Sequence, residues 1–183
     1  MPNILVLYAS THGQTRKIAQ RIGADLEAAG ADVTLTEAGG ADVPSLDTYD
    51  VVVIGASIHA GHHQHDVVDW ARHHAMRLSR APSALFSVSL SAAEDTDEGR
   101  TTTQRYVDDL LDDTGWNPTL KTSFAGALQY REYDFFTRMM MRLLMARGHH
   151  PTDTSRDTDY TDWDAVDAFA DRVIGLVPAA AAL

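Results

Sequence analysis

Six consecutive residues near the N-terminus, Ser10 to Thr15, have the composition of an anion-binding loop. They lie between an apolar run at 3–8 and an amphipathic pattern that continues to residue 29. A loop that leads into a helix N-terminus exposes unpaired N–H groups, and the helix dipole adds positive potential, so it can bind a phosphate. Its hydroxyl side chains add donors, and Gly13 permits backbone conformations that other residues resist. An N-cap and a tight turn without a ligand have the same pattern, so the loop alone leaves both interpretations open.

The loop matches neither of the two common nucleotide-binding patterns. The pattern GxxxxGK is absent, since Arg16 and Lys17 fall inside the predicted helix, and GxGxxG requires more glycines than this loop has. A receiver domain that accepts a phosphate on an aspartate is also disfavoured. Such a domain needs acidic residues at the ends of the first and third strands, where this chain has Ala9-Ser10 and Gly55-Ala56-Ser57.

Strand and helix patterns alternate along nearly the whole chain. Apolar runs predict strands at 3–8, 31–36, 50–57, 83–90 and 119–128. Helical spacing predicts helices at 15–29, 63–78, 101–114, 133–147 and 161–176, the last with Thr161 and Asp164 spaced as a capping box. Residues 91–100 read as a polar loop. We therefore expect one α/β domain over residues 1–183, with a doubly wound parallel sheet of five strands in the order 2-1-3-4-5.

This topology predicts the position of the site. In such sheets ligands bind beyond the carboxyl ends of the strands, where the strand order reverses between the first and third strands. The loops at 9–15, 56–62 and 90–100 follow the first, third and fourth predicted strands. We therefore expect these three loops to form the site together.

Several segments, taken in order, resemble one known family. The loop YASTHGQTRKIA is similar to the phosphate loop of flavodoxins. The later segments YDVVVIGASIHAGHH, APSALFSVSLSA, FAGALQYREYDFFTRMMMRLLM and YTDWDAVDAFA resemble successive blocks of the menaquinone-dependent protoporphyrinogen IX dehydrogenases, a flavodoxin-like branch with a late insertion. Together the blocks cover nearly all of residues 3–176, and the insertion would occupy about 129–158 as a helical segment.

The resemblance implies an enzyme that uses FMN. It would oxidise protoporphyrinogen IX and pass electrons to a quinone, in haem biosynthesis; a flavodoxin-type electron carrier or a small FMN quinone reductase is the alternative. The implied phosphate-binding residues are Ser10, Thr11, His12, Gly13, Gln14 and Thr15. Those implied along the flavin ring and ribityl chain are Ser57, Ile58, His59, Gly61, Ser87, Ser89, Leu90, Ser91 and Ala92. No side chain is assigned as a catalytic acid or base, because the flavin carries the redox chemistry.

Residues 130–148 combine a broad apolar stripe with arginines in an otherwise acidic protein. A core helix with arginines at its edges has this pattern, and so does a surface helix that contacts a membrane or a lipid-soluble quinone. Arginines also bind substrate carboxylates through two hydrogen bonds. The residues expected to contact substrate or membrane are Arg131, Phe135, Phe136, Arg138, Met139 and Arg142.

The charge of the chain limits its partners. The formal net charge is −11, and 21 of the 26 acidic residues are aspartate, while lysine occurs only twice. Such a surface repels nucleic acid and resembles that of proteins from salt-accumulating organisms. No cysteine is present and the N-terminus lacks the basic head of a signal peptide, so we expect a cytoplasmic protein, peripheral on the membrane if 130–148 contacts it. The sequence leaves the oligomeric state open.

Two further groups of residues affect the interpretation. Six histidines crowd into residues 59–74, but no established ligand spacing is present, so we expect no metal site. The loop after the fourth predicted strand carries Glu94, Asp95, Asp97 and Glu98, whereas the family tends to be basic there. Four carboxylates at the site would repel the propionates of a porphyrinogen, which makes the tetrapyrrole the weakest part of the resemblance.

Overall fold

A computed structural model of the chain describes residues 1–39, 45–128 and 158–179. Its main sheet contains the parallel strands β1 (Asn3–Ala9), β2 (Asp32–Glu37), β3 (Val51–His59), β5 (Ser83–Ser89) and β6 (Leu120–Ala125). Their spatial order is β2-β1-β3-β5-β6. This is the predicted order 2-1-3-4-5, because the short strand β4 (His62–His63) only forms a hairpin with β3. A separate antiparallel pair joins β7 (Ala127–Leu128) and β8 (Thr158–Asp159).

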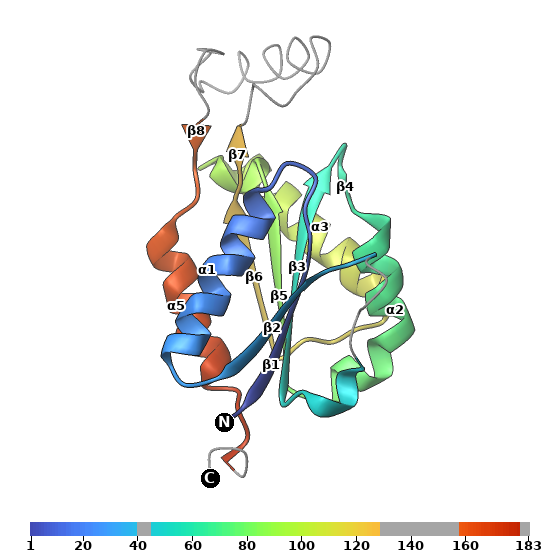
Figure 1. Cartoon of the computed structure of the whole chain (residues 1–183). Helices are drawn as coiled ribbons and strands as arrows, with labels where there is room; N and C mark the ends of the chain where they lie inside the picture. Colours follow the sequence, from blue (N-terminus) through green and yellow to red (C-terminus); the bar gives the residue numbers. More distant parts are fainter. Residues whose placement is uncertain (40–44, 129–157, 180–183) are drawn as a thin grey trace.

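Helices cover both faces of the sheet (Figure 1). On one face lie α1 (Gln14–Ala28) and α5 (Trp163–Ile174), and on the other α2 (His65–Arg80) and α3 (Asp97–Thr114). Three short elements complete the described parts, the 3-10 turns η1 (Leu46–Thr48) and η2 (Ser91–Ala93) and the hairpin strand β4. The layers are those expected from alternating strand and helix patterns.

Alternating side chains of the central strands form two separate cores. In β1, Ile4 and Val6 pack toward α1 and α5, whereas Leu5 and Leu7 pack toward α2 and α3. Because both faces are covered, nearly every residue of β1, β3 and β5 is buried, which explains their continuous apolar runs. The rigid central strands fix the positions of the loops at their carboxyl ends.

The starts of two helices differ from the predictions. The first turn of α3 begins at Asp97, inside the predicted loop 91–100, because the Thr96 side chain accepts a hydrogen bond from the Gly99 N–H and caps the helix. The predicted capping box at Thr161 and Asp164 is wrong. Asp162 caps α5 by accepting from the Ala165 N–H, since the Thr161 hydroxyl is hydrogen-bonded elsewhere.

Candidate functional site

Three loops meet at the carboxyl edge of the sheet, as its topology requires. They are the first loop (10–13, after β1), the second loop (57–64, which includes the end of β3 and the β4 hairpin) and the third loop (90–96, after β5). The register pairs Ala9 with Ala56 and Ser57 with Val88, so the three strands end side by side. This is the edge at which open α/β sheets bind their ligands.

The first loop leaves the N-terminus of α1 free of a side-chain cap. Gly13 stands at the N-cap with φ 83°, and its N–H donates to Ser10 Oγ over 2.9 Å. No side chain of the described residues caps α1, and its first turn contains no acidic residue. In contrast, α3 and α5 both have capping side chains and acidic residues in their first turns. The start of α1 is therefore the one of these three helix ends that suits an anion.

Space for such an anion exists beside the loop. A Cβ atom built on Gly13 would meet no atom of the described residues within 4 Å. A similar opening lies at Gly61 in the second loop, which has φ 87°. Both loops therefore carry open backbone toward the same edge of the sheet.

A glutamine that the sequence analysis did not select joins the first and second loops. Ser57 Oγ donates to Gln64 Oε1 over 3.1 Å, and Gln64 Nε2 donates to Thr11 Oγ1 over 2.7 Å. The rings of His12 and His59 lie 5.7 Å apart, between centroids, across the same junction. The structure thus brings Thr11 and His12 of the first loop close to Ser57 and His59 of the second. The only feature of the sequence that could have indicated Gln64 is its position as a polar residue directly before α2.

The predicted residues of the third strand and loop differ in accessibility. Ser87 and Ser89 are buried, Ser87 Oγ lies 2.9 Å from His63 Nε2, and Ser89 Oγ accepts from the Ala92 N–H over 3.3 Å. The Ser87 hydroxyl therefore stabilises the second loop through His63, and the Ser89 hydroxyl stabilises the third loop through the Ala92 N–H. Among the predicted residues here and in the second loop, the partly exposed ones are Ser57, Ile58, Leu90, Ser91 and Ala92.

Burial lowers the pKa of His63 from 6.5 to about 4. Because the folded pKa is the lower one, the unfolded chain takes up the proton first, and the stability present above pH 6.5 is lost as pH falls toward 4. We expect wild type to lose about 2 kcal/mol more unfolding free energy between pH 7 and pH 5 than His63→Asn. Urea unfolding at both pH values measures this, and equal losses in the two proteins would contradict it.

The acidic residues at 94–98, which span the end of the third loop and the start of α3, are partly neutralised. Arg100 contacts Asp95 through Nη1 and Asp97 through Nη2, each at 2.7 Å. No ion pair of Glu94 occurs within the described residues. This single arginine offsets one of the four negative charges at 94–98, and its two partners are exposed side chains, so the stretch keeps a net negative charge.

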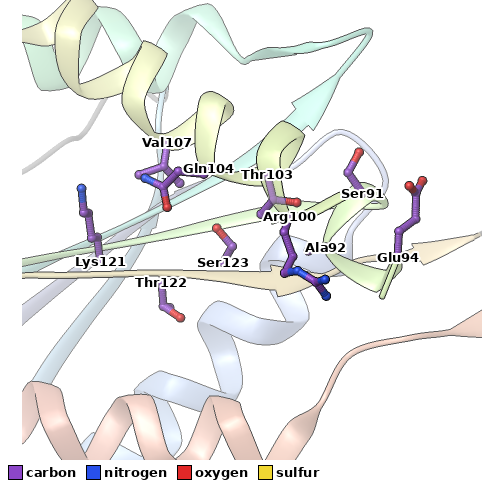
Figure 2. A pocket seen from close by; sticks show the side chains of 10 residues that line it. All are labelled: Ser91, Ala92, Glu94, Arg100, Thr103, Gln104, Val107, Lys121, Thr122 and Ser123. Carbon is purple, nitrogen blue, oxygen red and sulfur yellow. The ribbon is translucent and has the colours of Figure 1, made fainter. Parts of the chain in front are cut away.

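A hollow of about 360 Å³ lies next to the third loop, between α3 and β6 (Figure 2). Its lining residues are Ser91, Ala92, Glu94, Arg100, Thr103, Gln104, Val107, Lys121, Thr122 and Ser123. The first and second loops do not line it. The hollow adjoins the site behind the third loop and has a mixed-charge wall.

Other predicted features fall outside these loops. The expected contact residues Arg131, Phe135, Phe136, Arg138, Met139 and Arg142 lie outside the described residues. Within the described ranges, no three His, Asp or Glu side chains are grouped so that they could hold a metal ion. No helix in the same ranges is both long and apolar enough to cross a membrane.

Comparison with known proteins decides the family. A sequence profile described as "Flavodoxin domain" matches residues 5–155. Protoporphyrinogen IX dehydrogenase [quinone] of Escherichia coli (strain K12) is 36% identical over 173 residues, which are 94% of this chain and 94% of that protein. The chain belongs to this flavodoxin-domain family. The enzyme of the same name from Leishmania major is 37% identical over 174 residues, 92% of this chain and 73% of that protein.

Solved structures agree with the flavodoxin fold. Oxidised flavodoxin 1 from Bacillus cereus superimposes with a TM-score of 0.58 at 14% sequence identity, over 96% of this chain and 99% of that chain. At this identity the similarity establishes the fold only.

FMN is the cofactor that membership of the flavodoxin family implies, and the residues present fit its phosphate. The uncapped start of α1 and the hydroxyls of the first loop offer hydrogen-bond donors to a phosphate, and the open space at Gly13 gives it room.

Proposed function

We propose that this protein oxidises protoporphyrinogen IX to protoporphyrin IX, with FMN as its redox group and a quinone as electron acceptor. The observation that carries the proposal is the 36% identity to protoporphyrinogen IX dehydrogenase [quinone] over 94% of both chains. That match is nearly complete in length, whereas the solved flavodoxin above shares only the fold, at 14% identity. A simple electron carrier is therefore the weaker alternative.

The three loops would divide the binding of FMN among them. The first loop and the start of α1, Ser10 to Thr15, would hold the phosphate. Ser57, Ile58, His59 and Gly61 would border one side of the flavin ring, and Leu90 to Ala92 the other, while the buried Ser87 and Ser89 support these loops. When bound, FMN accepts the hydrogen equivalents removed from the substrate and passes the electrons on.

The segment 129–157 would provide the contacts with substrate and quinone. It is joined to the described structure by β7 and β8, which extend from the end of the sheet that carries the three loops (Figure 1). Its arginines, Arg131, Arg138 and Arg142, would bind propionates, and its apolar residues would contact the membrane that holds the quinone. Arg100, paired with Asp95 and Asp97, would offset only one of the four negative charges at 94–98, so an anionic substrate depends on these arginines.

An anaerobic assay tests the proposal. FMN-loaded protein is mixed with protoporphyrinogen IX, and flavin absorbance and porphyrin fluorescence are followed before and after a soluble menaquinone analogue is added. We expect flavin absorbance to fall when porphyrinogen is added. Once the quinone is present, we expect porphyrin to accumulate to a concentration greater than that of the enzyme. If porphyrinogen leaves the flavin oxidised while the dithionite-reduced protein still transfers electrons to the quinone, the protein is a carrier or a quinone reductase.

A further inference from the structure

A buried side-chain amide connects the first loop to a distant part of the chain. Gln14 is 5% exposed and is the first residue of α1, directly after Gly13. Its Nε2 donates to Asp159 Oδ1 over 2.9 Å and to Thr161 Oγ1 over 2.8 Å. Both acceptors follow the segment 129–157, so this amide joins the start of the fold to the chain beyond that segment.

Thr161 extends the network to the residues that precede the segment. Its Oγ1 donates to the Ala125 carbonyl over 2.8 Å, and its N–H donates to Asp159 Oδ1 over 2.9 Å. The Tyr160 N–H donates to the Gly126 carbonyl over 3.2 Å, and β7 pairs with β8. We call residues 125–128 and 158–161 the root of the segment. Gln14 thus contacts the root at the point where its two chains are joined.

The same residue also belongs to the phosphate site through its backbone. The N–H groups of the first helical turn have no intrahelical acceptors, and no side chain of the described residues caps them in α1. A phosphate bound there therefore fixes the backbone of Gln14, whose side chain is held by the root. Its side chain is buried, so a shift of either partner would leave the Gln14 Nε2 group without an acceptor, which is unfavourable.

We propose that Gln14 and Thr161 are positioning residues that couple occupation of the phosphate site to the order of the root. FMN binding strengthens the β7–β8 root, and an intact root strengthens FMN binding by the same factor, because such coupling is reciprocal. The proposal requires FMN as the cofactor but not a particular substrate, so failure of the porphyrinogen assay leaves it standing.

Hydrogen exchange with and without FMN tests the coupling. In wild type we expect FMN to slow exchange of the Tyr160 and Thr161 amides by about tenfold. Thr161→Val removes the hydroxyl at nearly constant volume, and in this variant we expect FMN to slow exchange by less than about threefold. FMN affinity should fall by the ratio of the wild-type protection to that of the variant. Gln14→Met, which keeps the length of the side chain without its amide, should give the same result independently.

A matched control separates coupling from general loss of stability. Thr114 is also a buried threonine, 5% exposed, and its Oγ1 donates to the Leu110 carbonyl over 2.8 Å at the far end of α3. Thr114→Val should therefore destabilise the fold but preserve full protection of the root by FMN. If FMN protects the root equally in wild type, Thr161→Val and Gln14→Met, or does not protect it in wild type, the proposal is wrong.

Discussion

Replacing Gly13 with valine is expected to weaken FMN binding by about a hundredfold or more. Gly13 has φ 83°, a conformation that a β-branched residue adopts only with strain, so the first loop must change its backbone to accept valine. The new side chain would also extend into the open space beside the loop, where we place the phosphate. Titration of the apoprotein with FMN, followed by quenching of flavin fluorescence, measures the loss.

Gly30 offers a matched control for this substitution. It lies just beyond the other end of α1 with φ 92°, and a Cβ there would also meet nothing within 4 Å in the described residues. Gly30→Val should therefore cost a similar unfolding free energy, about 1–3 kcal/mol, while FMN affinity changes less than about threefold. Equal weakening of FMN binding by both substitutions, or normal binding by Gly13→Val, would show that the first loop does not hold the phosphate.

The fold was predictable because burial on both faces leaves a strong pattern in the sequence. Strands such as 3–8 and 83–90 are rich in apolar residues, and each is followed by a polar loop and helical spacing, so the layers and the strand order follow from general rules. The hairpin strand β4 was missed, because two residues, His62 and His63, are too short for any periodicity. The loops at the carboxyl edge were predictable for the same topological reason.

The internal arrangement of the site was less accessible to sequence analysis. The hydrogen bond from Gln64 to Thr11 spans 53 residues and that from Gln14 to Thr161 spans 147, so neither leaves a local pattern. A serine pattern likewise does not distinguish a hydroxyl that faces a ligand from one that supports a loop, as Ser87 does beside His63. Residue types at the site followed from sequence, whereas their partners depended on the folded geometry.

Gly55→Ala is expected to be the most destabilising single substitution considered, at about 3 kcal/mol or more. Gly55 lies in β3 opposite Phe86 of β5, and an added Cβ would overlap Phe86 Cζ and come within 2.6 Å of both Cε atoms. The Phe86 ring is fully buried, with the rings of Phe124 and Phe169 at centroid distances of 5.9 Å and 6.2 Å, so it has little room to move. Urea unfolding of wild type and variant measures the difference.

Two further variants show whether overlap with Phe86 is the cause. Gly23→Ala also adds one methyl group, but its Cβ would meet Val33 Cγ1 at an ordinary 3.7 Å inside helix α1, so we expect a gain of up to about 1 kcal/mol. Combining Gly55→Ala with Phe86→Leu removes the ring atoms that overlap, and the double variant should be more stable than the sum of the two single losses by about 1 kcal/mol or more. If the losses of unfolding free energy in the two single variants simply add in the double variant, Gly55→Ala acts through the strand backbone instead. The central sheet would then not require a glycine at this position to accommodate the Phe86 ring.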